Sequence, residues 1–383
     1  MQKSALEGLR VLELGSLIAG PFAGRIFADF GAEVIKVENE KDGDPLRVWR
    51  EVEEGTSLWW YVQSRNKKSV EINLKSELGQ RFIKEIVKGI DIIIENFRPG
   101  KLEEWGIGYE DLKKINPKLI MVRISGFGQD GPKSKYPGFG SIGEAMGGLR
   151  YLTGYPDRPP TRVGLSIGDS IAGLYGVIGA LMAVYYRDNN SDFEGQCVDV
   201  SLYESIFSLT ESLVPEYDRK QVIRERSGST LPGITPSNTY ECKDNQYVVI
   251  GANGDSIFKR LMLLIGREDI ANDERFTTNA LRNSHAEYLD GVIAEWTKSK
   301  DIDSVVDLLN ENGIPAGKIY SVKDIIEDSH YKEREMILDI ETPIGPLKMP
   351  GIVPKLSISP GKVKWAGPEL GANNSEFLKL DKV

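Results

Sequence analysis

Residues 10–38 read RVLELGSLIAGPFAGRIFADFGAEVIKVE, and this stretch decides the fold class. Two short apolar runs, 10–14 and 32–38, are typical of buried strands. Between them lies a helical segment, 21–30, which begins with Pro21 and ends before Gly31. Strands that alternate with helices form βαβ units, in which the strands are parallel and helices cover both faces of the sheet. The stretch therefore predicts an α/β fold.

The same alternation continues along the first half of the chain. Further strands are expected at 69–74, 91–96 and 119–124, with an amphipathic helix at 76–89. We predict an open, doubly wound, mostly parallel sheet. After residue 211 the composition changes, and one strand followed by several amphipathic helices predicts a smaller α+β domain. The expected domains are 1–220 together with 330–383 for the large one and 221–329 for the small one.

The composition excludes several classes of protein. The 383 residues include 48 Lys+Arg and 57 Asp+Glu, a net charge of -9 that argues against a nucleic-acid partner. Two cysteines and two histidines are too few for a disulfide framework, a Ser-His-Asp triad or an HExxH zinc centre. We expect no metal site. If the protein is an enzyme, carboxylates are expected to carry the chemistry.

The longest uncharged run, 170–186, borders on the length of a membrane span. It contains three glycines, ends in two tyrosines and follows Asp169 directly, so we predict a buried core helix. The N-terminal residues lack the apolar stretch of a signal peptide. A cytoplasmic protein with no membrane partner is expected.

Three local patterns have both a functional and a structural interpretation. Residues 126–131, GFGQDG, fit G-x-G-x-x-G, but prolines follow where a dinucleotide-binding helix should begin, which favours a glycine-rich loop beside a ligand. Residues 64–69, SRNKKS, place three cations in one predicted loop, as expected equally of a phosphate site and of a solvated turn. Asp169 is interpreted either as the N-cap of the long helix or as a carboxylate kept ionised by that helix for use as nucleophile or base.

An ordered series of segments carries a resemblance to a known family. The segments are 9–14 (LRVLEL), 29–38 (DFGAEVIKVE), 66–69 (NKKS), 95–100 (ENFRPG), 125–128 (SGFG), 168–169 (GD), 313–316 (GIPA) and 349–351 (MPG). With these segments the chain resembles the class III CoA-transferases, a superfamily that includes formyl-CoA transferase, carnitine CoA-transferase and the 2-methylacyl-CoA racemases. Within it, the chain is most similar to the branch that uses succinyl-CoA and dicarboxylic acids.

The resemblance implies an interlocked, ring-like homodimer and an enzyme without a tightly bound cofactor, whose substrates are a coenzyme A thioester and a small carboxylic acid. It implies that Asp169 attacks the thioester, giving a mixed anhydride and then an aspartyl-CoA thioester. The implied CoA contacts are Leu17, Ile18, Glu38, Ile72, Asn73, Leu74, Lys75, Asn96, Phe97, Arg98, Pro137, Gly138, Phe139 and Gly140.

The chain also departs from its relatives at three places. Glu104 stands where many members have an arginine, residues 227–233 replace the glycine run of the formyl-CoA enzymes, and 137–140 lack the histidine base of the racemases. Two alternatives to CoA transfer follow. One is an isomerase that removes the proton next to the thioester carbonyl with Asp169 as acid or base, and the other is a non-catalytic CoA-binding subunit. The missing histidine argues against the first, and the retained Asp169 argues against the second.

Overall fold

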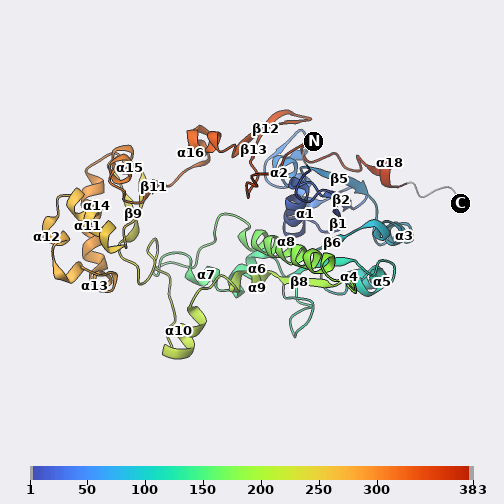
Figure 1. Cartoon of the computed structure of the whole chain (residues 1–383), viewed down its shortest axis with the longest axis horizontal. Coiled ribbons are helices and arrows are strands. Elements are labelled where there is room, and N and C mark those ends of the chain that lie inside the picture. Colours follow the sequence, from blue (N-terminus) through green and yellow to red (C-terminus); the bar gives the residue numbers. More distant parts are fainter. Residues whose placement is uncertain (1–2, 379–383) are drawn as a thin grey trace. The chain divides into compact units, whose positions relative to one another are not determined.

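The computed structural model describes residues 3–378, and the contacts divide the chain into two compact units (Figure 1). The large unit contains residues 3–149, 163–223 and 330–378, and the small unit contains 150–162 and 224–329. Segment 150–162, which the sequence pattern placed in the large domain, belongs to the small unit. The domain assignment itself stays a prediction, because compactness alone does not show that a part folds independently.

A six-stranded sheet forms the centre of the large unit, in the order β5-β2-β1-β6-β7-β8. Every neighbouring pair is parallel, with Leu12 of β1 opposite Ile35 of β2 and Ile93 of β6. The strands are β1 (Arg10–Glu13), β2 (Glu33–Glu38), β5 (Lys67–Glu71), β6 (Ile92–Glu95), β7 (Ile120–Ser125) and β8 (Cys197–Ser201). The predicted α/β fold with a parallel sheet is confirmed. The direction of winding reverses between β1 and β6, and open sheets of this kind bind ligands at such a point.

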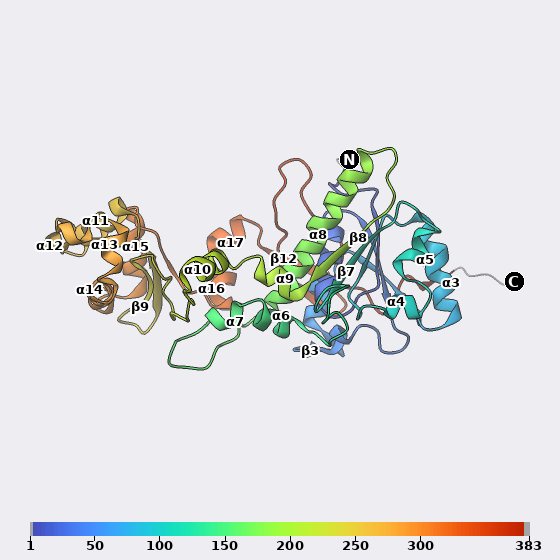
Figure 2. The same cartoon turned by 90° about the horizontal axis from the view of Figure 1, so that it is seen from below.

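Helices cover both faces of this sheet, which explains why its central strands are apolar without alternation. Helices α1 (Ala19–Asp29) and α8 (Ile167–Asp188) pack on the face that presents Val11. The opposite face presents Leu12 and is covered by α3 (Glu77–Ile86) and α5 (Tyr109–Lys113). Figure 2 shows α8 on one side of β7 and α3 and α5 on the other.

The remaining elements of the large unit are short. They are η1 (Pro45–Val48), β3 (Val52–Glu53), β4 (Thr56–Ser57), α2 (Leu58–Gln63), η2 (Val87–Gly89), α4 (Lys101–Glu104), α6 (Gly140–Met146), α9 (Leu202–Phe207), α10 (Leu213–Lys220), the hairpin β12 (Ile337–Thr342) and β13 (Gly345–Pro350), and α18 (Asn374–Phe377). Helices α7 (Leu149–Leu152) and α17 (Ser329–Glu333) lie at the boundaries between the units. The C-terminal segment returns to the sheet, where the Asn373 side chain accepts a hydrogen bond from the Ser69 N–H.

The small unit has its own core and combines helices with an antiparallel sheet. The sheet order is β11-β10-β9, with β9 at Ser237–Glu241, β10 at Tyr247–Gly251 and β11 at Ala316–Lys318. Its helices are α11 (Asp255–Leu264), α12 (Glu268–Ala271), η3 (Glu274–Phe276), α13 (Asn279–Asn283), α14 (Ala286–Lys298), α15 (Ile302–Glu311) and α16 (Val322–Glu327). The apolar faces of α11, α14 and α15 contribute Leu261, Leu289 and Val305 to this core.

Helix α8 differs from its prediction at both its start and its surface. It begins at Ile167 with Ser166 as N-cap, so Asp169 is the third helical residue and the N-cap interpretation of Asp169 is wrong. Gly173 lets α8 approach α1 closely and Gly176 lets it approach β7, but the opposite face of the helix is exposed. Within residues 3–378, α8 is the one helix long and apolar enough to cross a membrane by length and composition, and 39% of its most apolar window is buried.

Buried ion pairs connect the first three strands in the sheet order, from the last residue of β1 to the first residue of β5. The Glu13 carboxylate lies 2.9 Å from Lys36 Nζ of β2 and 2.7 Å from Lys67 Nζ of β5, and these side chains are at most 1% exposed. Lys36 also pairs with Asp44 at 2.8 Å. Two carboxylates therefore balance two ammonium groups, as buried charges require.

Segment 64–69 is neither a phosphate site nor a solvated turn, so both interpretations of it are wrong. Residues 64–67 are buried, and Lys67 and Lys68 already belong to β5. Arg65 forms hydrogen bonds of 2.7–3.2 Å with both carboxylate oxygens of Asp29, and the Asn66 side chain donates to the same carboxylate. All three cations are engaged in ion pairs within the protein: Arg65 with Asp29, Lys67 with Glu13, and the 26% exposed Lys68 with Glu33 and Glu376.

We predict that Glu13→Gln destabilises the large unit by about 3–5 kcal/mol, because it leaves two buried ammonium groups with one carboxylate. The midpoint of urea unfolding measures this loss. The control is Glu85→Gln, which removes an ion pair to Lys88 whose side chains are 57% and 59% exposed. That variant should change the free energy of unfolding by less than about 1 kcal/mol. Equal midpoints for the two variants would contradict the role given to Glu13.

Candidate active site

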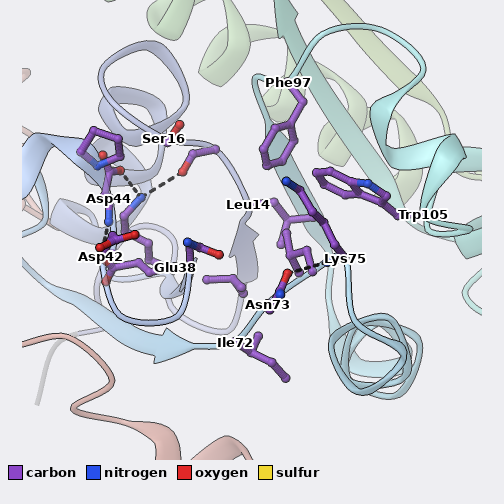
Figure 3. Close-up of a pocket in the computed structure, with 17 residues that line it drawn as sticks. Leu14, Ser16, Glu38, Asp42, Asp44, Ile72, Asn73, Lys75, Phe97 and Trp105 are labelled. Atoms are coloured by element: carbon purple, nitrogen blue, oxygen red, sulfur yellow. Dashed lines mark hydrogen bonds and ion pairs between the residues drawn. The ribbon is translucent and has the colours of Figure 1, made fainter.

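A cavity of about 360 Å³ lies at the carboxyl ends of β1, β2, β5 and β6 (Figure 3). We call it the first cavity. It is lined by Leu14, Gly15, Ser16, Lys36, Val37, Glu38, Asn39, Asp42, Gly43, Asp44, Pro45, Ile72, Asn73, Leu74, Lys75, Phe97 and Trp105. Of the expected CoA contacts, Glu38, the segment 72–75 and Phe97 meet here. The sequence analysis did not identify Lys36, Asp42, Asp44 or Trp105 as part of this site.

The two sides of the first cavity differ in chemistry (Figure 3). Phe97, Trp105 and Leu14 lie on one side together with Lys75, whereas Glu38, Asp42 and Asp44 lie on the other. The Phe97 and Trp105 rings meet edge to face with centroids 5.3 Å apart. An apolar wall beside polar groups is typical of small-molecule sites.

The acidic side is largely neutralised by its own partners. Arg47 donates to both Glu38 oxygens at 2.8 and 2.9 Å and lies over the Trp60 ring. Burial disfavours the charged form of Asp44, but Lys36 and the N–H groups of Leu46 and Leu17 outweigh it and lower the pKa of that carboxyl. The charges of Glu38 and Asp44 in the cavity wall are therefore already compensated within the protein.

Leu17 and Asn96 shape the turn after β1 and do not line the first cavity. The Asn96 side chain accepts from the Ser16 N–H at 2.8 Å and donates to the Ser16 carbonyl at 2.9 Å. Gly15 is required there, because a Cβ would lie 2.6 Å from Asn96 Oδ1. Leu17 has a positive φ of 65°, and its N–H donates to the Asp44 carboxylate at 3.0 Å. Both residues position the turn.

Asp169 lies in the first turn of α8 against Gly140, the first residue of α6. A Cβ at Gly140 would overlap Asp169 Oδ2, so only glycine permits this approach. No helix interrupts residues 126–139 between β7 and α6, as predicted from the prolines. Within this loop Gly138 packs against Gly126, while Pro137 and Phe139 are exposed. The structure thus brings Gly140 to Asp169, but Asp169 does not line the first cavity.

Two residues near β6 have a different environment from the one expected. Arg98 is exposed and lines neither the first cavity nor the second cavity, which is described below. Glu104 forms an ion pair of 2.7 Å with Lys101, so the charge of this glutamate is paired within α4.

A second cavity of about 380 Å³ lies between α1, α2 and the first turn of α8. Its lining consists of Ile18, Phe22, Arg25, Arg50, Glu51, Leu58, Trp59, Gln63, Leu165, Ser166 and Ser170. Ile18 is the one expected CoA contact among them. The sequence analysis missed Arg25, although a charged residue among the apolar positions of α1 was the available signal.

Comparison with known proteins decides the family. The sequence model of CoA-transferase family III matches residues 6–374. This chain belongs to that family. It is 50% identical to the succinyl-CoA–D-citramalate CoA-transferase of Chloroflexus aurantiacus, over 97% of this chain and 93% of the relative. The β subunit of the succinyl-CoA–L-malate CoA-transferase from the same organism is 38% identical, over 98% of this chain and 93% of the relative.

A solved structure agrees with this assignment. The CAIB/BAIF family protein from Brucella suis superimposes with a TM-score of 0.86 at 32% identity, over 98% of both chains. The resemblance found in the sequence is confirmed, and the protein is a family III CoA-transferase. Asp169 and the first cavity are therefore features of a CoA-transferase.

The buried lysines of this CoA-transferase predict a pH dependence of stability. Burial lowers the pKa of the Lys67 ammonium to about 8, although Glu13 opposes the shift. Lysine in the unfolded chain titrates near 10.4, so between these values the unfolded state binds more protons. The free energy of unfolding should therefore rise with pH in this window, by at most about 1.4 kcal/mol per pH unit.

Urea unfolding of wild type and Lys67→Met at a series of pH values from about 7.5 to 10 measures this effect. The rise should be present in the wild type and absent from the variant, which has no group to titrate at this position. Lys36 does not confound the window, because Asp44 and Glu13 outweigh burial and raise its pKa. Parallel pH profiles for the two proteins would contradict the assignment.

Proposed function

We propose that this enzyme moves CoA from succinyl-CoA to a small dicarboxylic acid through covalent intermediates on Asp169. The observation that carries the proposal is the placement of the Asp169 carboxylate in the first turn of α8, with Gly140 leaving room beside it. The helix dipole and the free N–H groups of a first turn favour the ionised carboxylate, which is the nucleophilic form.

The proposed reaction balances without an outside reagent. A carboxylate oxygen of Asp169 attacks the thioester carbonyl, the C–S bond breaks and CoA leaves as thiolate. The thiolate then attacks the aspartyl carbonyl carbon of the mixed anhydride, which releases succinate and leaves an aspartyl-CoA thioester. The acceptor carboxylate and the thiolate repeat these two steps in reverse, which yields the new acyl-CoA and restores Asp169. Each step breaks one acyl bond and forms another, so covalent catalysis divides the exchange into separate acyl transfers.

We propose that the first cavity holds the nucleotide end of CoA. The aromatic side with Phe97 and Trp105 suits the adenine ring, and the exposed Lys75 ammonium suits a phosphate. The location at the carboxyl ends of the strands, where the winding reverses, supports the assignment. The other expected contacts, Leu17, Ile18, Asn96, Arg98 and 137–140, are proposed to shape or extend this path toward Asp169.

We propose a cytoplasmic homodimer, and the exposed face of α8 supports a second copy of this chain as the partner. Leu174, Ile178 and Met182 follow one another at intervals of four residues and are 44%, 45% and 66% exposed. That spacing places them on one face of the helix, and Tyr185 and Tyr186 extend it with 73% and 55% exposure. A continuous apolar face of this kind marks an interaction surface.

Asp169→Asn should lower the rate of CoA transfer by at least about 10⁴-fold, because an amide cannot form the anhydride. Chromatography of the acyl-CoA products from succinyl-CoA and D-citramalate measures the rate. Asp218→Asn, at a side chain 72% exposed on α10, is the matched control and should keep the wild-type rate. Transfer by Asp169→Asn at the wild-type rate would make the proposal untenable.

The isomerase alternative is tested with the same protein in deuterated water. Incubation with a 2-methylacyl-CoA should leave the α-carbon without deuterium, because 137–140 supply no histidine base. Mass spectrometry that finds deuterium in the 2-methylacyl-CoA, with no transfer from succinyl-CoA, would replace CoA transfer by isomerisation.

Met182→Glu should convert the dimer to a monomer, because it places a charge in the centre of the apolar face. Size-exclusion chromatography with light scattering at micromolar concentration measures the mass. Leu78→Glu changes a side chain 46% exposed on α3 and should leave the mass unchanged. A wild-type protein that elutes as a monomer would refute the proposed dimer.

A further inference from the structure

The second cavity contains a guanidinium group that lacks a counter-ion. Arg25 Nε is buried and has no hydrogen-bond partner within the described residues, and none of the ion pairs found there involves Arg25. The group lies over the Phe22 ring at 4.5 Å. Burial and the neighbouring Arg65 lower the pKa of Arg25 to about 10, with Asp29 opposing. Asp29 is already bound by Arg65 and Asn66, so it does not serve as a partner.

A buried guanidinium N–H without a partner is costly, and it offers a donor to a ligand in the cavity. The other charged groups on the cavity wall are Arg50, which lies over the Trp59 ring at 4.5 Å, and Glu51. Two guanidinium groups and one carboxylate leave the cavity with a net charge of one positive unit. The cavity is therefore matched to an anion of one negative charge, such as a carboxylate.

The cavity also borders the helix turn that carries the residue proposed to form the covalent intermediates. Ser166 and Ser170 belong to its wall and flank Asp169 in the first turn of α8. The Cα atoms of Asp169 and Ser170 are adjacent along the chain and so lie about 3.8 Å apart. We therefore expect an acid with one carboxyl group at Asp169 to extend its opposite end toward this cavity.

We propose that Arg25, assisted by Arg50, binds the carboxylate of the dicarboxylic substrate that does not react. The proposal rests on the proposed function and adds the residue that selects the substrate class. A guanidinium binds a carboxylate through two parallel hydrogen bonds. A monocarboxylic acid of the same length would leave Arg25 unpaired, and sites built for a polar group reject such analogues strongly.

Kinetics with matched acids test the assignment. The wild type should transfer CoA from succinyl-CoA to succinate analogues and glutarate far better than to butyrate. Arg25→Gln should raise the KM for glutarate about 100-fold. The same substitution should leave the weak rate with butyrate unchanged. Arg25→Lys, which keeps the charge without the paired donors, should fall between the two. Arg81→Gln, at an exposed position of α3, controls for the loss of one positive charge.

Binding without turnover separates this proposal from the proposed function. Free succinate should raise the thermal unfolding temperature of the wild type, whereas butyrate should not. Without ligand, Arg25→Gln should unfold at the same temperature as the wild type. Succinate should not raise the unfolding temperature of this variant. If succinate stabilises both proteins equally, or if CoA alone gives the shift that Arg25→Gln removes, the carboxylate site is refuted. If succinate binding depends on Arg25 but no CoA is transferred, the proposed function fails and the site stands.

Discussion

Three parallel strands meet at one buried carboxylate, and the geometry of the first cavity depends on it. Glu13 is the last residue of β1 and forms ion pairs with Lys36 of β2 and Lys67 of β5, the next two strands in the sheet order. Helix α1 packs directly against the Glu13 carboxylate, because a Cβ at Gly24 of this helix would overlap Glu13 Oε2. A fixed register of β1, β2 and β5 follows, and with it the position of the loops that form the cavity.

The same ion pairs connect the core to the site. Lys36 pairs with Asp44, whose carboxylate accepts the N–H of Leu17 in the turn after β1. Asn96 of the neighbouring β6 segment holds Ser16 in the same turn. A buried network of ion pairs and hydrogen bonds makes its surroundings rigid, and here it fixes the turn after β1 beside the first cavity. Leu17 and Asn96 therefore support this turn, and their direct contact with CoA stays a prediction.

The fold was predictable because its signal is local and repeated. The apolar runs of β1, β2, β6 and β7 and the glycine that ends α1 are present in the sequence, and so is the ordered series of family segments. Pairing between distant charged residues leaves no such pattern, so 64–69 was interpreted as a loop although Arg65 and Lys67 are buried against Asp29 and Glu13. The helix start was placed three residues late for a related reason, since Ser166 caps α8 without a side-chain hydrogen bond. Arg25 was not predicted as a site residue, because the sequence of one helix does not show which side chains from other elements surround it. The lack of a carboxylate partner therefore becomes visible only in the structure.

The account of catalysis depends on a covalent bond to Asp169, and one measurement tests that bond directly. The protein is incubated with succinyl-CoA, quenched in acid and digested with trypsin, and the peptide 163–187 is examined by mass spectrometry. Asp169 is the only carboxylate side chain between Arg162 and Arg187, so the peptide identifies the site without ambiguity. The account predicts that this peptide carries CoA as a thioester. Formation of a new acyl-CoA with the label on another peptide, or on none, would contradict it.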